Sequence, residues 1–176
     1  MLFRSGAEMG RIVYVNGDYL DEAEAKVSIF DRGFLMADGV YEVTSVLGGK
    51  LIAFAGHIER LGRSLSELDM APPAAMDSLL DIHRELVIRN DLVDGLVYLQ
   101  VTRGAPADRD FEFPDPDETP STLVMFTQSK PGLADNPLAK KGIKVISIED
   151  IRWGRRDIRS EERRVGKGWR PRRAPL

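Results

Sequence analysis

Two short turns, each flanked by residues that alternate between apolar and polar, constrain the fold of this chain most strongly. The first is Asn16-Gly17, inside the run RIVYVNGDYL at positions 11–20. The second is Gly48-Gly49, inside VYEVTSVLGGKLIAFAG at positions 40–56. Both pairs tolerate the positive φ that two-residue hairpin turns require, and alternation is typical of strands with one buried face. The sequence therefore predicts two β-hairpins.

Two amphipathic segments follow, and then two more strands. Residues 57–70 carry an apolar stripe at helical spacing, formed by Ile58, Leu61, Leu65 and Leu68. Residues 75–92 are predicted to form a second helix, with Leu79, Leu86 and Val87 pointing inward. Strands are predicted at 95–104 and 121–128, on either side of a polar loop, 105–120, whose length favours a functional role. This order predicts one α+β unit over residues 11–130, with both helices on one face of its sheet. A linker-like segment leads from it to another strand, expected to begin in GIKVISIEDIRW at 142–153.

The distribution of charge separates the end of the chain from the rest. Residues 155–176 hold nine Lys and Arg against three Asp and Glu, whereas residues 1–154 hold 16 against 25. The acidic main body argues against nucleic-acid binding there.

No apolar run approaches the roughly 20 residues that span a bilayer, so we expect no membrane segment. The chain has no cysteine, which suits a reducing cytoplasm.

Four stretches, in order, resemble the class IV pyridoxal-phosphate aminotransferases, and among them the D-amino-acid (D-alanine) transaminase branch. They are DRGFLMADGVYEV at 31–43, HIERL at 57–61, YLQVTRG at 98–104 and EDIRWGRRDI at 149–158. The resemblance implies a small α+β domain at 9–130, a linker at 131–141 and the start of a larger domain at 142–158. In this family the cofactor lies between the two domains, usually in a homodimer.

The resemblance also implies roles for three side chains. Arg60 matches the arginine that binds the phosphate of pyridoxal 5'-phosphate, and a guanidinium suits phosphate because it can donate bidentately. Tyr41 matches a tyrosine that contacts the substrate carboxylate, and Arg109 matches an arginine of a carboxylate trap. Spacing alone also fits structural interpretations: Arg60 as a solvated helix arginine, Tyr41 as a packed strand tyrosine and Arg109 as an exposed loop arginine. The D-alanine enzymes usually have histidine two residues after the trap arginine, where this chain has Phe111.

The family's cofactor-binding lysine would fall at Arg159, in DIRS at 157–160. Arginine stays protonated and has no free amine to form an imine, so it cannot replace lysine there. RSEERRVGK resembles a translated sequencing-library adapter, and LFRS at positions 2–5 resembles the adapter of the other end. We therefore expect 1–8 and 159–176 to be non-native tails, with Met9 as the natural start. A basic arm that binds a polyanion is the competing interpretation.

The remaining polar residues are interpreted structurally. His83 falls on the apolar stripe of its helix and is predicted to be packed, and His57 is predicted to be structural. Neither has partners at metal-ligand spacing. Asp31, Arg32 and Asp38-Gly39 are interpreted as turn and loop chemistry that shapes the approach to Tyr41.

The expected function is transfer of an amino group from a D-amino acid to a 2-oxo acid by a pyridoxal-phosphate enzyme, with this chain an inactive fragment. A branched-chain aminotransferase or an aminodeoxychorismate lyase of the same family is the alternative. From another class, a binding module with a basic tail also fits.

Overall fold

The computed structural model describes residues 10–135 and 141–147. Its six strands form one antiparallel sheet in the order β2-β1-β6-β5-β3-β4. The strands are β1 (Ile12–Val15), β2 (Asp18–Asp21), β3 (Gly39–Leu47), β4 (Lys50–Leu51), β5 (Gly95–Thr102) and β6 (Thr122–Ser129). The helices are α1 (Arg32–Met36), α2 (Phe54–Glu67) and α3 (Leu79–Arg89), with short 3-10 turns at Met76–Ser78 and Leu133–Asp135.

Both predicted hairpins are confirmed, and they lie at opposite edges of the sheet. Asn16 and Gly17 connect β1 to β2 with φ values of 48° and 115°. Gly48 and Gly49 connect β3 to β4 with φ values of 55° and 73°. Because the two turns close antiparallel pairs locally, the central strands β5 and β6 are left to join the two hairpins into one sheet.

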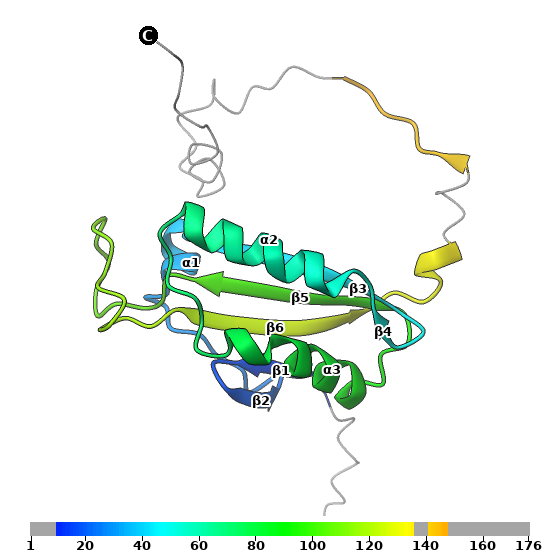
Figure 1. The fold of residues 1–176 in the computed structure, drawn as a ribbon, viewed down its shortest axis with the longest axis horizontal. Coiled ribbons are helices and arrows are strands. Elements are labelled where there is room, and N and C mark those ends of the chain that lie inside the picture. Colours follow the sequence, from blue (N-terminus) through cyan, green and yellow to red (C-terminus); the bar gives the residue numbers. More distant parts are fainter. Residues whose placement is uncertain (1–9, 136–140, 148–176) are drawn as a thin grey trace, which may run out of the picture.

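The two long helices cover the same face of the sheet, as predicted (Figure 1). Apolar side chains of α2 and α3 meet those of the central strands in a single buried cluster. Its fully buried members are Val46, Leu61, Leu79, Leu86, Val97, Leu99, Val101 and Met125. The α+β fold class is therefore confirmed. No helix among the described residues is long and apolar enough to cross a membrane.

The helix α2 is shifted toward the N-terminus relative to the prediction of 57–70. It begins at Phe54 and ends at Glu67, so Leu68 falls beyond it and is 42% exposed rather than part of the buried stripe. The backbone N–H of Met70 donates to the carbonyl of Leu65 and closes the helix end. Met70, which is 5% exposed, thereby fills the place in the core that the stripe assigned to Leu68.

The second predicted helix, 75–92, is shorter than expected, with a 3-10 turn first and α3 ending at Arg89. Leu79, Leu86 and Val87 are buried as predicted. His83 is packed as predicted: it is 1% exposed, and its ring meets Phe54 edge-on at 4.9 Å between centroids.

The strand predicted to begin at Gly142 is absent over 142–147, the part of it that the structure describes. Ile143, Val145 and Ile146 are 72%, 79% and 87% exposed there. A strand needs a neighbour for its backbone N–H and C=O groups, and no described strand lies beside this segment to supply one. Residues 148–153 of that prediction, Arg159, Met9 and the two predicted tails lie outside the described residues.

Candidate functional site

The exposed edge of β3 places two polar side chains on opposite faces of the sheet. Over Gly39–Ser45 this strand pairs only with β5 among the described strands, because β4 reaches no further than Val46. Successive side chains point to opposite faces. Glu42 points toward α2 and is 4% exposed, whereas Tyr41 points to the opposite face and is 66% exposed.

The carboxylate of Glu42 holds the side chain of Arg60, which α2 brings over the strand. Nε of Arg60 donates to Oε1 at 2.7 Å, and Nη2 donates to Oε2 at 2.6 Å. Nδ1 of His57, one helical turn before Arg60, lies 2.8 Å from Oε2. The two parallel hydrogen bonds between Arg60 and Glu42 fix the plane of the guanidinium. We call Glu42, His57 and Arg60 the Glu42 cluster.

Electrostatics within the Glu42 cluster favours the charged forms. Burial alone would raise the pKa of Glu42, but hydrogen bonds from Arg60 and His57 outweigh burial and lower that pKa below its ordinary value. The hydrogen bonds with Glu42 raise the pKa of Arg60, with the nearby Tyr41 as a smaller cause. Glu42 is therefore a carboxylate at neutral pH, and Arg60 is a cation held in a defined orientation.

Part of the Arg60 guanidinium stays available for another ligand. Its side chain is 56% exposed although Nε and Nη2 are both engaged. Within the part of the chain that the structure describes, Nη1 donates no hydrogen bond. An oriented, accessible pair of N–H groups on a cation suits an anion such as a phosphate. The solvated-arginine reading of Arg60 misses the buried carboxylate that orients it.

Tyr41 begins a row of stacked rings across the open face of the sheet. Its ring lies 5.8 Å from that of Tyr98, which lies 4.9 Å from that of Phe126. The Tyr98 hydroxyl donates to the side-chain carbonyl of Gln100. Tyr41 is thus supported by packing on one side, while most of its surface remains accessible.

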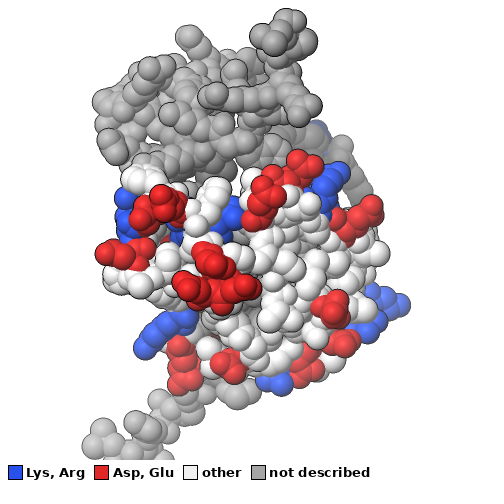
Figure 2. Space-filling view, turned by 60° about the vertical axis from the view of Figure 1, so that its left-hand side comes forward, with Lys and Arg blue, Asp and Glu red and all other residues white. Residues whose placement is uncertain are grey.

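Arg109 lies in the long loop and stays apart from the Glu42 cluster. Asp108 and Asp110 flank it, and acidic side chains are prominent on this side of the molecule (Figure 2). Yet their carboxylates accept hydrogen bonds from the backbone N–H groups of Arg109 and Phe111, at 2.7 and 2.6 Å. The guanidinium of Arg109 lies 4.8 Å from the Phe111 ring centroid. Among the described contacts, none joins Arg109 to Tyr41 or Arg60.

Sequence reasoning missed Glu42 and underestimated Arg32 and Asp38. The signal for Glu42 was its inward position in the alternating strand, where a carboxylate requires a partner. Asp31 does act in local turn chemistry, since it accepts from the backbone N–H of Gly33 and caps α1. Arg32 and Asp38, however, form a buried ion pair at 2.7 Å, with side chains 4% and 14% exposed.

Comparisons with known proteins identify the family of this chain. Residues 39–163 match the family model for amino-transferase class IV. The D-alanine aminotransferase of Staphylococcus haemolyticus is 39% identical over 148 residues, which are 84% of this chain and 51% of that protein. The D-alanine aminotransferase of Listeria monocytogenes is 36% identical over 148 residues, covering 84% and 50%. The chain thus spans about half the length of the curated relatives it matches.

Solved structures share the fold. A branched-chain amino acid aminotransferase from Escherichia coli superimposes with a TM-score of 0.60 at 16% identity, covering 69% of this chain and 41% of that one. The 4-amino-4-deoxychorismate lyase from Pseudomonas aeruginosa gives 0.52 at 25% identity, covering 68% and 40%. The described fold is the N-terminal α+β domain of these enzymes. The cofactor of the family is pyridoxal phosphate. With its family match spanning most of its length and its fold shared with these enzymes, the chain belongs to the class IV aminotransferases.

Proposed function

We propose that this chain forms one wall of the cofactor site of a transaminase that moves an amino group from a D-amino acid to a 2-oxo acid. The observation that carries the proposal is the oriented guanidinium of Arg60, set by Glu42 beside the exposed Tyr41. The relatives named D-alanine aminotransferase, 36–39% identical to this chain, support the choice of substrate. The proposal includes a homodimer in a reducing cytoplasm.

The residues present fit the phosphate group of the cofactor. Arg60 and Glu42 together are close to neutral, so Arg60 would hold a phosphate through directed hydrogen bonds from Nη1 more than through net charge. His57 supports the same carboxylate from the other side. Pyridoxal phosphate, when bound, serves as the electron sink that eases proton loss from the Cα of an amino acid. In this chain Arg60 positions the cofactor through its phosphate.

Tyr41 and Arg109 would bind the substrate carboxylate. The Tyr41 hydroxyl can donate to a carboxylate oxygen, and its ring is already supported by Tyr98. Among the described contacts, the Arg109 guanidinium forms no ion pair with Asp108 or Asp110, and one oxygen of each of these carboxylates accepts from a backbone N–H group. The hydrogen bond from Tyr41 and the positive charge of Arg109 would together fix the orientation of the substrate and of its Cα.

Arg159 sets a limit on what the chain does by itself. It stands where the family has its lysine, and a guanidinium offers no amine for imine formation and no base for the proton at Cα. We therefore propose that the 176-residue chain does not transaminate. It should still bind phosphate or carboxylate weakly through Arg60, Tyr41 and Arg109.

Two alternatives belong to the proposal. A branched-chain aminotransferase or an aminodeoxychorismate lyase would use the same phosphate site, and Phe111 in the place of the usual histidine favours looking beyond D-alanine. A binding module with a basic tail would need no Glu42 cluster, and its tail lies outside the described residues. The Glu42 cluster beside Tyr41 favours a class IV enzyme over a binding module, and the relatives named D-alanine aminotransferase favour the D-amino-acid transaminase within that class.

The test extends the chain after Ile158 with the lysine-containing, leucine-rich continuation typical of the family. We expect pyruvate formation from D-alanine with 2-oxoglutarate and pyridoxal phosphate, and no turnover after replacement of the restored lysine by alanine. Parallel assays with L-leucine and aminodeoxychorismate test the alternatives. Preference for L-leucine would refute the D-specific assignment, and robust turnover by the 176-residue chain would refute the role assigned to position 159.

A further inference from the structure

The long loop between β5 and β6 is held at its middle by a buried arginine that is distant in sequence but lies at the same end of the domain (Figure 1). Arg32, in α1, is 4% exposed. Its Nη1 donates to the backbone carbonyls of Asp110 and Glu112, at 2.8 and 3.0 Å. Its Nε donates to Oδ2 of Asp38 at 2.7 Å. The two carbonyls lie on either side of Phe111 and directly after Arg109, so Arg32 fixes the backbone path of the segment that carries Arg109.

A second buried arginine shares the same carboxylate. Nε of Arg103 donates to Oδ2 of Asp38 at 3.0 Å. Its Nη1 and Nη2 donate to the carbonyls of Asp69 and Leu68, both at 2.9 Å, in the turn that follows α2. Asp38 therefore connects the loop anchor to the end of α2, the helix that carries His57 and Arg60 of the Glu42 cluster. We call Arg32, Asp38 and Arg103 the Asp38 cluster.

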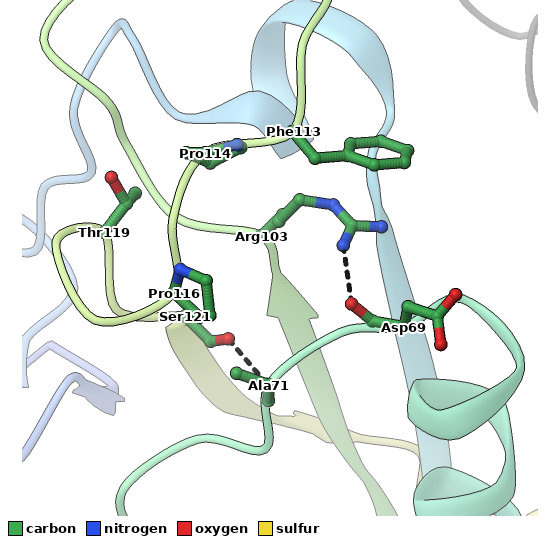
Figure 3. Close-up of a pocket in the computed structure, with 8 residues that line it drawn as sticks. All are labelled: Asp69, Ala71, Arg103, Phe113, Pro114, Pro116, Thr119 and Ser121. Atoms are coloured by element: carbon green, nitrogen blue, oxygen red, sulfur yellow. Dashed lines mark hydrogen bonds between the residues drawn. The ribbon is translucent and has the colours of Figure 1, made fainter.

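Phe113 closes the loop over the Asp38 cluster. Its ring centroid lies 4.0 Å from the guanidinium carbon of Arg103 and 5.5 Å from that of Arg32. Figure 3 shows the ring lying over Arg103 beside the bond to Asp69. A pocket of about 190 Å³ beside it is lined by the same ring and by the far part of the loop. The loop is thus held against the cluster at its middle, through residues 110–113.

The charge of the Asp38 cluster explains why the loop takes this path. Two guanidinium groups face one carboxylate, so the cluster carries one excess positive charge with little access to water. A buried charge without compensating partners is strongly unfavourable. Four backbone carbonyls and the face of Phe113 supply that compensation, and two of those carbonyls and the ring belong to the loop. Moving the loop away would break both hydrogen bonds from Nη1 of Arg32 and remove the Phe113 ring from the cluster.

We propose that Arg32 is a positioning residue: it holds the 105–120 loop in the conformation that presents Arg109 to the carboxylate of an amino-acid substrate. The loop position follows from the Asp38 cluster alone, whereas the carboxylate role of Arg109 rests on the proposed function. The fork of Arg32 is essential, because only a guanidinium can reach Asp38 and both loop carbonyls together. Lysine at position 32 would keep the charge and lose that geometry.

The first test measures trypsin cleavage after Arg109 in the 176-residue chain, followed by mass spectrometry. We expect Arg32→Lys and Arg32→Met each to speed this cleavage about tenfold, because a charge-assisted anchor is lost. Arg84→Met is the matched control, since Arg84 is 61% exposed and makes a single ion pair at 3.5 Å within α3. Its cleavage rate after Arg109 should equal that of the parent chain.

Two outcomes would overturn the anchoring role. One is a parental cleavage rate in Arg32→Lys, which would mean that charge suffices without the fork. The other is an equal rise in cleavage after Arg89, in α3, which would report general unfolding instead of loop opening. Phe113→Leu removes the ring and leaves all three charges, and it should speed cleavage after Arg109 severalfold even if the Arg32 variants fail to fold.

The second test measures steady-state kinetics in the extended chain. Arg32→Lys should raise KM for D-alanine about tenfold with kcat changed less than about twofold, because the loop contributes to binding rather than to chemistry. An extended chain without transaminase activity would refute the proposed function and leave the proteolysis result standing. An active extended chain whose KM is unchanged by Arg32→Lys would refute the positioning role alone.

Discussion

His83 should make the stability of this domain fall as the solution is acidified. The side chain is 1% exposed, and its Nδ1 donates to the Leu79 carbonyl at 2.7 Å. Its ring packs edge-on against Phe54, the first residue of the helix that carries Arg60. Burial lowers the pKa of His83 from 6.5 to about 4 because the imidazolium would lose its hydration. The folded chain therefore keeps His83 neutral where the unfolded chain protonates it.

The size of the effect follows from these two pKa values. Because the unfolded state binds the proton more readily, stability is complete above about pH 6.5 and is lost as the pH falls toward 4. Between pH 7.5 and 4.5 the loss attributable to His83 is about 2.5 kcal/mol. For a domain of this size that is a large fraction of the total free energy of unfolding.

The assay is urea denaturation followed by far-UV circular dichroism at pH 7.5 and 4.5, for the parent chain and for His83→Gln. Glutamine does not ionise, so the variant should lose about 2.5 kcal/mol less than the parent over this interval. The carboxylates of the chain are the same in both proteins, so their contributions cancel in the comparison. Equal losses in parent and variant would show that burial does not suppress protonation of His83.

Three further predictions concern packing and the Glu42 cluster. Gly95→Ala should destabilise the domain by at least about 2 kcal/mol, because the added Cβ would overlap the backbone carbonyl of Gln128 in β6. Gly62→Ala, in α2, should stabilise the domain by roughly 0.5–1 kcal/mol, because among the described residues the added Cβ would meet no atom within 4 Å outside the backbone of the helix itself. Thermal denaturation of the two variants checks both signs. Glu42→Gln should lower the free energy of unfolding by about 1–2 kcal/mol in the same measurement, since the carboxylate that pairs with Arg60 is lost while Arg60 remains partly solvated. An unchanged temperature of unfolding would show that this ion pair does not stabilise the domain. Arg60→Met should weaken binding of pyridoxal phosphate to the 176-residue chain about tenfold in a fluorescence titration, while Arg63→Met on the exposed side of the same helix should not.

Local patterns in the sequence predicted the strands of the sheet, the two long helices and their order, but not the five-residue helix α1, which falls in a stretch interpreted as turn and loop. Asn16-Gly17 and Gly48-Gly49 specify hairpins through backbone conformations that few other residues adopt. The apolar spacing of α2 and α3 specifies which face of each helix is buried, and together with the alternating strands it predicts two helices on one face of a sheet. These features depend on neighbours within a few residues, so a single sequence contains the information.

The end of α2 and the segment 142–147 differ from what the sequence pattern predicted. Met70 is buried in place of Leu68, which the apolar stripe predicted to be buried, because the last turn of α2 closes on Leu65. Spacing alone cannot distinguish these two apolar residues. At 142–147 the sequence has strand character, but a strand forms only where another backbone is present to pair with it.

Only the tertiary structure decided which charged groups meet. The sequence marked Arg60 by resemblance, but its pairing with Glu42 requires α2 to cross β3 at one position. The Asp38 cluster brings together the first residue of α1, the residue before β3 and the residue after β5. Such pairs are set by the packing of whole elements, because a carboxylate can be buried only where the fold delivers its partners.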